Sequence, residues 1–365
     1  MKNHKTNCAG FLWYLLNFSL FVLCLNLMSI QLSKAEDIDD LFSAEVTLDN
    51  KANNPLENAY KEALNVVLTK ISHSDFSANK EAVKKLFPIP SAYVNQFRPS
   101  IDDKLRVSFD AEAIQDILRN AGYIVWGEDR PLTLIWLAVD WGQGEREIIS
   151  DGNVDLTIEP SHSIDRSRLL YRRISEIADE RGIPIVFPLL DTIDLRNLTF
   201  SDIWGGFDEQ VIKVSDRYKV DSILIGRIRP HTNLSNRWSY FFEGKKWVWA
   251  DPSEEVISEI ADILAAEFAV GGNAVLENVV LNISGIDTLI DFGLLKTLLS
   301  EISLIEDFMV LEVSGNKVKY RVKVRGGVKR LRRVLNLTAQ LKQVDTNIRS
   351  DLESMNELEF NLIDN

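Results

Sequence analysis

The sequence predicts a multidomain protein of mixed α+β and α/β class, with a small N-terminal helix-on-sheet domain, a central three-layer α/β domain and a C-terminal ferredoxin-like βαββαβ domain. Three observations predict it: strand-like and helix-like patterns mix before residue 123, two apolar runs of strand length follow Pro131, and the last part has a β-α-β-β-α-β pattern. The expected segments are a leader at 1–35, the N-terminal domain at 36–125, the central domain at 126–272, the ferredoxin-like domain at 273–345 and a polar tail at 346–365.

In the N-terminal domain, period-2 alternation predicts strands, and apolar residues at helical spacing predict helices. Asp110 has the chemistry of a helix N-cap, and Gly122 that of a helix stop. The expected elements are a strand at 42–48, a helix at 55–70, a shorter helix at 79–87, strands at 92–97 and 104–109, and a helix at 111–120.

In the central domain, "LTLIWLAV" and "DSILIGRI" are apolar enough to be central strands buried on both faces. Strands that alternate with helices predict the three-layer arrangement. The expected elements are strands at 132–139, 183–189 and 221–228, helices at 165–181, 201–218 and 254–270, an aromatic hairpin at 238–249, and a polar loop at 142–160.

The last domain has the clearest pattern, with a turn at 315–316 between two strands. The tail after residue 345 is polar, which indicates a loose helix or disorder. The expected elements are a strand at 279–284, a helix at 287–300, strands at 304–313 and 317–324, a helix at 328–335 and a strand at 339–344.

Residues 1–35 have the pattern of a secretory signal, because they contain three lysines, no acid and an uncharged apolar run at 11–30. The small residues Ser33 and Ala35 predict cleavage after Ala35. The signal as a whole predicts export to the periplasm. The apolar run is longer than an ordinary signal core, so an uncleaved inner-membrane anchor stays an alternative.

Both cysteines, Cys8 and Cys24, lie in the leader, so the exported chain is expected to have neither disulfides nor thiolate chemistry. Loss of the leader changes the formal net charge from −13 to −16. An acidic chain of this kind argues against nucleic-acid binding.

Residues with metal or catalytic chemistry are few. After the leader, only His73, His162 and His231 remain, without the spacing of a zinc site or the partners of a Ser-His-Asp triad. Residues 151–155 place oxygens at alternate positions, but Leu156 stands where a calcium loop needs glycine. The sequence also lacks a phosphate-binding loop. We therefore expect no metal site and no cofactor.

Two pairs of acids, Asp191 with Asp194 and Asp202 with Asp208, have residue types suited to acid–base chemistry. In a chain with 54 acidic residues, closeness in sequence is weak evidence for a site. We expect no catalytic residues.

One local feature departs from the acidic composition. The segment "KVKYRVKVR" places Lys317, Lys319, Arg321, Lys323 and Arg325 on one strand face, and apolar residues on the other. In a ferredoxin-like domain the basic row lies on the sheet face without helices, where it could bind an anionic group or an acidic partner.

A neutralised row is the competing interpretation. A two-residue turn at 315–316 would place Glu312 opposite Lys319 and Glu306 opposite Arg325, which favours cross-strand ion pairs.

The aromatic hairpin has two interpretations as well. Trp238, Tyr240, Trp247 and Trp249 share one face, which could be a groove for a flat ligand or the buried face of a sheet. The apolar stripe of the helix that follows needs a partner, and this favours a buried face. Trp126, Arg130 and Trp136 surround Pro131 and are expected to pack at the junction of the first two domains.

The segments "VSFD" at 107–110, "YIVWGEDRPLTLIWLAVD" at 123–140 and "DSILIGRI" at 221–228 resemble an uncharacterised proteobacterial envelope family, domain of unknown function 2066. The most specific part of the resemblance is Trp126-Gly127, Arg130-Pro131 and Trp136. The resemblance implies an exported Gram-negative protein and no mechanism.

We therefore expect a periplasmic, non-enzymatic protein that binds another envelope protein or an anionic envelope component. The alternatives are a carboxylate-dependent cell-wall hydrolase that uses acids between residues 141 and 160, and a membrane-anchored scaffold.

Overall fold

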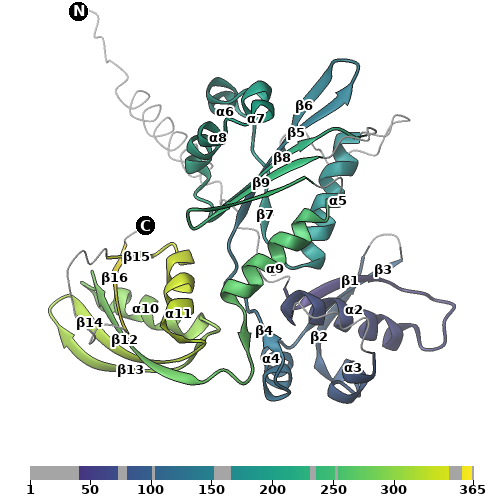
Figure 1. The fold of residues 1–365 in the computed structure, drawn as a ribbon. Coiled ribbons are helices and arrows are strands. Elements are labelled where there is room, and N and C mark those ends of the chain that lie inside the picture. Colours follow the sequence, from purple (N-terminus) through teal and green to yellow (C-terminus); the bar gives the residue numbers. More distant parts are fainter. Residues whose placement is uncertain are drawn as a thin grey trace, which may run out of the picture. The chain divides into compact units, whose positions relative to one another are not determined.

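The computed structural model describes residues 41–72, 80–100, 103–151, 166–230, 236–250, 254–344 and 356–363 (Figure 1). The expected leader, residues 152–155 of the segment with oxygens at alternate positions, and most of the expected tail lie outside the described residues. Within the described ranges, no helix combines the length and the apolar character needed to cross a membrane.

The N-terminal part is a three-stranded antiparallel sheet with helices packed on it. Strand β3 lies between β1 and β2. Asp110 is the helix N-cap that the sequence predicts, because its carboxylate accepts a hydrogen bond of 3.0 Å from the backbone N–H of Ala113. The elements are β1 (Ser43–Thr47), α2 (Pro55–Ser72), α3 (Lys80–Leu86), η2 (Pro90–Tyr93), β2 (Val94–Pro99), β3 (Lys104–Phe109), α4 (Ala111–Asn120) and β4 (Ile124–Val125).

The central part is a mixed six-stranded sheet. The strands run in the order β10-β9-β8-β5-β6, and β7 pairs with the start of β5. The elements are β5 (Thr133–Gly142), β6 (Glu145–Ile149), α5 (Arg166–Glu180), β7 (Ile185–Val186), α6 (Thr192–Asn197), α7 (Phe200–Gly205), α8 (Asp208–Ser215), η4 (Asp216–Tyr218), β8 (Ser222–Ile228), β9 (Arg237–Phe242), β10 (Lys245–Trp249), α9 (Val256–Phe268) and β11 (Val270–Gly271).

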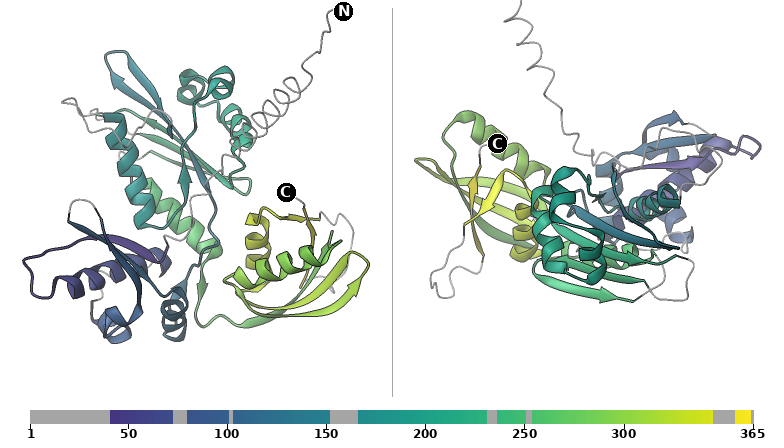
Figure 2. Two further views of the ribbon diagram at one scale, coloured as in Figure 1. Left: turned by 180° about the vertical axis from the view of Figure 1, so that it is seen from behind. Right: turned by 90° about the horizontal axis from the view of Figure 1, so that it is seen from above.

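Strand β5 is buried on both faces, as its apolar sequence predicts. Ile135, Leu137 and Val139 pack in one cluster with α5 and α9, whereas Leu134 and Trp136 pack in another with α7 and α8. The two views of Figure 2 and the view of Figure 1 agree that these helices cover opposite faces of the sheet. The central part is therefore layered as helix, sheet and helix.

Several expected elements of the central part are wrong. The polar loop expected at 142–160 is wrong for its first part, because β5 reaches Gly142 and turns into β6, which pairs antiparallel with it, and residues 152–160 lie outside the described residues. The expected strand at 183–189 has only the two residues of β7, and three short helices replace the single helix expected at 201–218. Strand β6 is polar because its first residues are exposed at a sheet edge, which conceals the period-2 pattern.

The C-terminal part is a five-stranded sheet in the order β13-β14-β12-β16-β15. Its elements are β12 (Leu276–Ser284), α10 (Leu289–Glu301), β13 (Ile305–Ser314), β14 (Lys317–Arg325), α11 (Gly327–Leu337), β15 (Leu341–Gln343) and β16 (Glu357–Leu362).

The ferredoxin-like arrangement is not confirmed, because the fourth strand differs. The neighbours β13, β14 and β12 have the expected order, but β16 takes the place beside β12 and runs parallel to it. The expected last strand, β15, lies beyond β16 at the edge. The tail therefore contributes an inner strand of the sheet, which corrects the expectation of a loose tail.

The described residues all belong to one contact unit that spans Asp39–Asn365. The buried side chains of the N-terminal part form their own cluster, whereas those of α9 and of the C-terminal sheet belong to one continuous cluster. The boundaries that the sequence predicts between the three domains stay a prediction.

Candidate functional site: the charged face of the C-terminal sheet

Strand β14 separates apolar from basic side chains. Val318, Tyr320, Val322 and Val324 are at most 2% exposed and pack in the cluster with α10 and α11. The five basic residues alternate with them and therefore lie on the opposite face of the sheet. Figure 1 shows α10 and α11 on one side of the sheet, and no described helix covers the basic side.

The register of the hairpin follows from its two-residue turn. Gly315 has φ of 60°, a conformation that favours glycine, and Ser314 pairs with Lys317 directly across the turn. Further along the hairpin, Glu312 lies opposite Lys319 as expected from the sequence. The turn thus sets the register as far as Glu312, and a bulge between Val310 and Glu312 then places Asp307 opposite Lys323.

The basic row is partly neutralised. Nη2 of Arg325 lies 2.8 Å from Oε2 of Glu306, and the hydrogen bond from Arg325 lowers the pKa of Glu306 below its ordinary value. Nζ of Lys319 lies 3.5 Å from Oε1 of Glu357 on β16, rather than in an ion pair with Glu312. The turn predicts the Glu306–Arg325 pair, whereas the pair of Lys319 with Glu357 is not predicted, because Glu357 lies in the segment expected to be a polar tail.

Acidic residues flank the basic strand on both sides. Asp307 and Glu312 lie on β13 beside the row, while Glu357 and Glu359 lie on β16 beyond β12. We call the whole set the charged face: Lys317, Lys319, Arg321, Lys323 and Arg325 with Glu306, Asp307, Glu312, Glu357 and Glu359. It is a surface of mixed sign, not a purely cationic one.

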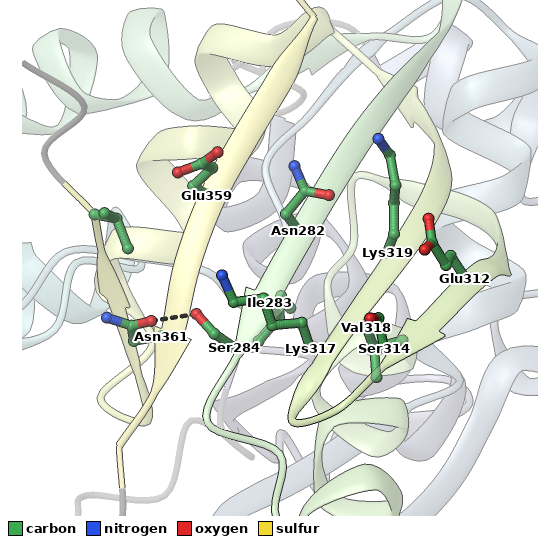
Figure 3. Close-up of a pocket in the computed structure, with 11 residues that line it drawn as sticks. Asn282, Ile283, Ser284, Glu312, Ser314, Lys317, Val318, Lys319, Glu359 and Asn361 are labelled. Atoms are coloured by element: carbon green, nitrogen blue, oxygen red, sulfur yellow. Dashed lines mark hydrogen bonds between the residues drawn. The ribbon is translucent and has the colours of Figure 1, made fainter. Parts of the chain in front are cut away.

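A shallow hollow of about 460 Å³ lies at the turn end of the charged face (Figure 3). Its floor is polar: Nδ2 of Asn282 donates to Oε1 of Glu357 at 2.7 Å, and the Ser284 hydroxyl is hydrogen-bonded to Asn361. The lining residues are Asn282, Ile283, Ser284, Glu312, Ser314, Lys317, Val318, Lys319, Val344, Glu359 and Asn361. This set offers ammonium, carboxylate, amide and hydroxyl groups, which suits recognition of polar groups of either sign.

The aromatic hairpin is placed against α9. Trp238 and Tyr240 are fully buried with the apolar stripe of α9, and Trp249 and Trp247 lie opposite them in the register and are partly buried on the same face. Gly226 of β8 makes room there, because a Cβ at this position would lie 2.5 Å from the Trp238 ring. The structure thus places helix α9 over the face on which a flat ligand would stack.

Trp126 and Arg130 lie where the chain passes from the N-terminal to the central part. The Arg130 guanidinium lies over the Trp126 ring at 4.2 Å and donates to the backbone carbonyls of Lys70 and Gly182 at 3.0 and 2.6 Å. Burial lowers the pKa of Arg130 to about 9, so the group keeps its charge at neutral pH. Trp136 lies apart from this contact, in the α7 and α8 layer.

The acid pairs of the central part hold helices. Asp191 caps α6 and receives two hydrogen bonds of 2.7 Å from Arg217, while the fully buried Asp194 also accepts one from Arg217. Asp202 belongs to the capping box of α7, and Asp208 forms ion pairs with Arg227 and Lys246. Among the described residues, no group of three or more histidine, cysteine or acidic side chains is arranged to hold a metal ion.

Replacing Asp191 with asparagine should remove a part of the stability that is present at neutral pH and lost in acid. The hydrogen bond from Arg217 holds the pKa of Asp191 below its ordinary value of 3.8, so the folded state binds this proton less tightly than the unfolded state. The stabilisation is present above that pH and is lost as the pH falls below it. Asp191→Asn should therefore be less stable than the parent at neutral pH, and the difference in melting temperature should shrink towards about pH 2.

The matched control is Glu62→Gln, which changes an exposed carboxylate on α2. It should leave the melting profile close to that of the parent at every pH. A difference between Asp191→Asn and the parent that stays constant from neutral to acid pH would show that the Arg217 pair is not the cause.

Comparisons with known proteins cover only the first part of the chain. A family model described as "Domain of unknown function (DUF8605)" matches residues 35–127, the segment from the end of the expected leader to Trp126-Gly127. The resemblance to domain of unknown function 2066 is therefore wrong: the matched domain is also uncharacterised, but it is a different one. The search of curated proteins and the search of solved structures found no match.

Proposed function

We propose that this is an exported, non-enzymatic protein that binds another protein of the cell envelope through the charged face. The observation that supports the proposal is a sheet face of alternating charge that no described helix covers. Export and the envelope setting are supported by the leader pattern of residues 1–35.

A protein partner fits the charged face better than a lipid surface or an acidic glycan. The acids on β13 lie one strand away from the basic row, a spacing of about 4.8 Å. Because that is well within a Debye length, a polyanion attracted by Arg321 would be repelled by Asp307 and Glu312. A protein surface can offer complementary charges of both signs.

The hydrolase alternative has little support from the described part of its loop. Oε2 of Glu145 pairs with Arg166 at 2.5 Å, and Oε2 of Glu147 accepts hydrogen bonds from Ser167 and Trp141. These contacts tie both acids to α5 and to the adjoining strand. The alternative of a membrane-anchored scaffold depends on whether the leader stays uncleaved, and the leader lies outside the described residues.

Reversing the charge of Lys319, Arg321 and Lys323 together should abolish salt-sensitive binding to an envelope protein. In the test, the immobilised protein captures envelope proteins at low and at high salt. The triple variant K319E/R321E/K323E should lose the captured protein, because the three substitutions change the formal charge of the face by six units.

The matched control, K61E/K84E/K85E, makes the same change at exposed positions of α2 and α3. It should keep the captured protein. If both triple variants capture the same proteins as the parent, the charged face is not the binding surface and the proposal fails.

A further inference from the structure

Strand β13 is an open edge of the C-terminal sheet. In the described part of the chain it pairs only with β14, so the backbone groups on its outer side are free for a further strand. Edge strands of soluble proteins are usually short, carry lysine or proline, or contain bulges, and each of these features discourages such pairing. Strand β13 spans Ile305–Ser314 and contains no lysine, arginine or proline, so it lacks the first two protections, although its pairing with β14 shifts between Ile305 and Asp307 and between Val310 and Glu312.

Strand β13 also exposes several apolar side chains. Met309, Val310, Leu311 and Val313 are 52%, 43%, 39% and 62% exposed. Exposed apolar side chains that gather on one element mark interaction surfaces. Helix α10 packs on this side of the sheet and adds Leu289, which is 88% exposed.

The two faces of β13 differ in chemistry. Val310 and Val313 lie opposite Tyr320 and Val318, so they continue the apolar, helix-covered face. Asp307 and Glu312 lie opposite Lys323 and Lys319, so they belong to the charged face. Neither acid forms an ion pair with any residue that the structure describes.

We propose that β13 binds an extended segment of the partner protein as an added strand, and that this segment alternates apolar with basic residues. Its apolar side chains would continue the row of Val310 and Val313, and its basic side chains would lie beside Asp307 and Glu312. Strand β14 has this chemistry and already pairs with the other side of β13. The inference rests on the proposed function, since it names the segment that a protein partner presents.

A second copy of this chain fits the same edge poorly. Strand β13 carries three acids and no base, so a β13–β13 contact would offer no cation to Asp307 and Glu312 in any register. Like charges opposite each other destabilise a strand pair. Charge complementarity therefore favours a basic segment.

The test uses a capped, labelled peptide of sequence KVKYRVKVR, titrated into the protein and followed by fluorescence anisotropy. Binding should saturate, and the backbone amides of residues 305–314 should gain protection from hydrogen exchange. The variant D307K/E312K should bind this peptide at least tenfold more weakly and should instead bind a peptide in which every lysine and arginine is glutamate. Val313→Lys, at a position that is 62% exposed, should also weaken binding while the melting temperature stays unchanged.

The matched control is E62K/E176K, which reverses two exposed acids on α2 and α5 and should bind like the parent. Peptide binding that D307K/E312K does not change, no binding at millimolar peptide, or a dimer that Val313→Lys dissociates would each overturn the inference. If D307K/E312K keeps the captured envelope protein while K319E/R321E/K323E loses it, the proposed function stands and the strand-addition inference fails. If both variants keep it, the proposed function fails as well.

Discussion

Arg130→Ala is expected to lower the free energy of unfolding by about 3–5 kcal/mol, one of the two largest losses that the structure predicts. The Arg130 side chain is buried and donates to the backbone carbonyls of Lys70, Trp126, Gly127 and Gly182. Without the guanidinium these carbonyls lose their donors, and a cavity opens beside the Trp126 ring.

Two further variants separate the geometry of Arg130 from its charge. Arg130→Lys keeps the charge but has a single nitrogen in place of the planar fork, so we expect an intermediate loss. Arg98→Ala removes an exposed arginine of β2 and should change the stability by no more than about 0.5 kcal/mol. Chemical denaturation measures all three, and an Arg130→Ala protein as stable as Arg98→Ala would contradict the proposed contact.

Trp238→Ala is expected to cost about 3–5 kcal/mol of stability, because the ring is fully buried beneath α9. Trp249→Ala, directly opposite it in the strand register, should cost only about 1–2 kcal/mol because that ring is partly exposed. The same denaturation experiment compares the two. Equal and small losses would mean that the hairpin does not contribute its aromatic face to the core.

The features that could be predicted from the sequence depend on local chemistry. Alternation in "KVKYRVKVR" together with the turn at 315–316 predicted the basic row and the position of Glu312 opposite Lys319. The Asp110 cap and strand β5, which is buried on both faces, could also be predicted, because each pattern is complete within a few residues.

The features that could not be predicted depend on contacts between distant segments. Strand β16 alternates Leu358, Phe360 and Leu362 with polar residues, a usable signal that the surrounding polar tail obscured. Its pairing with β12 spans more than 70 residues, which no local pattern specifies. The ion pair of Lys319 with Glu357 was missed for that reason.

The central claim, that the charged face binds a protein, is tested most directly by a photo-crosslinking amino acid placed at position 321 in the living cell. Position 84, on an exposed turn of α3, is the matched control. The proposal predicts a crosslinked protein from position 321 that is absent from position 84 and is lost when K319E/K323E is added. No protein adduct at position 321, or identical adducts from both positions, would contradict it.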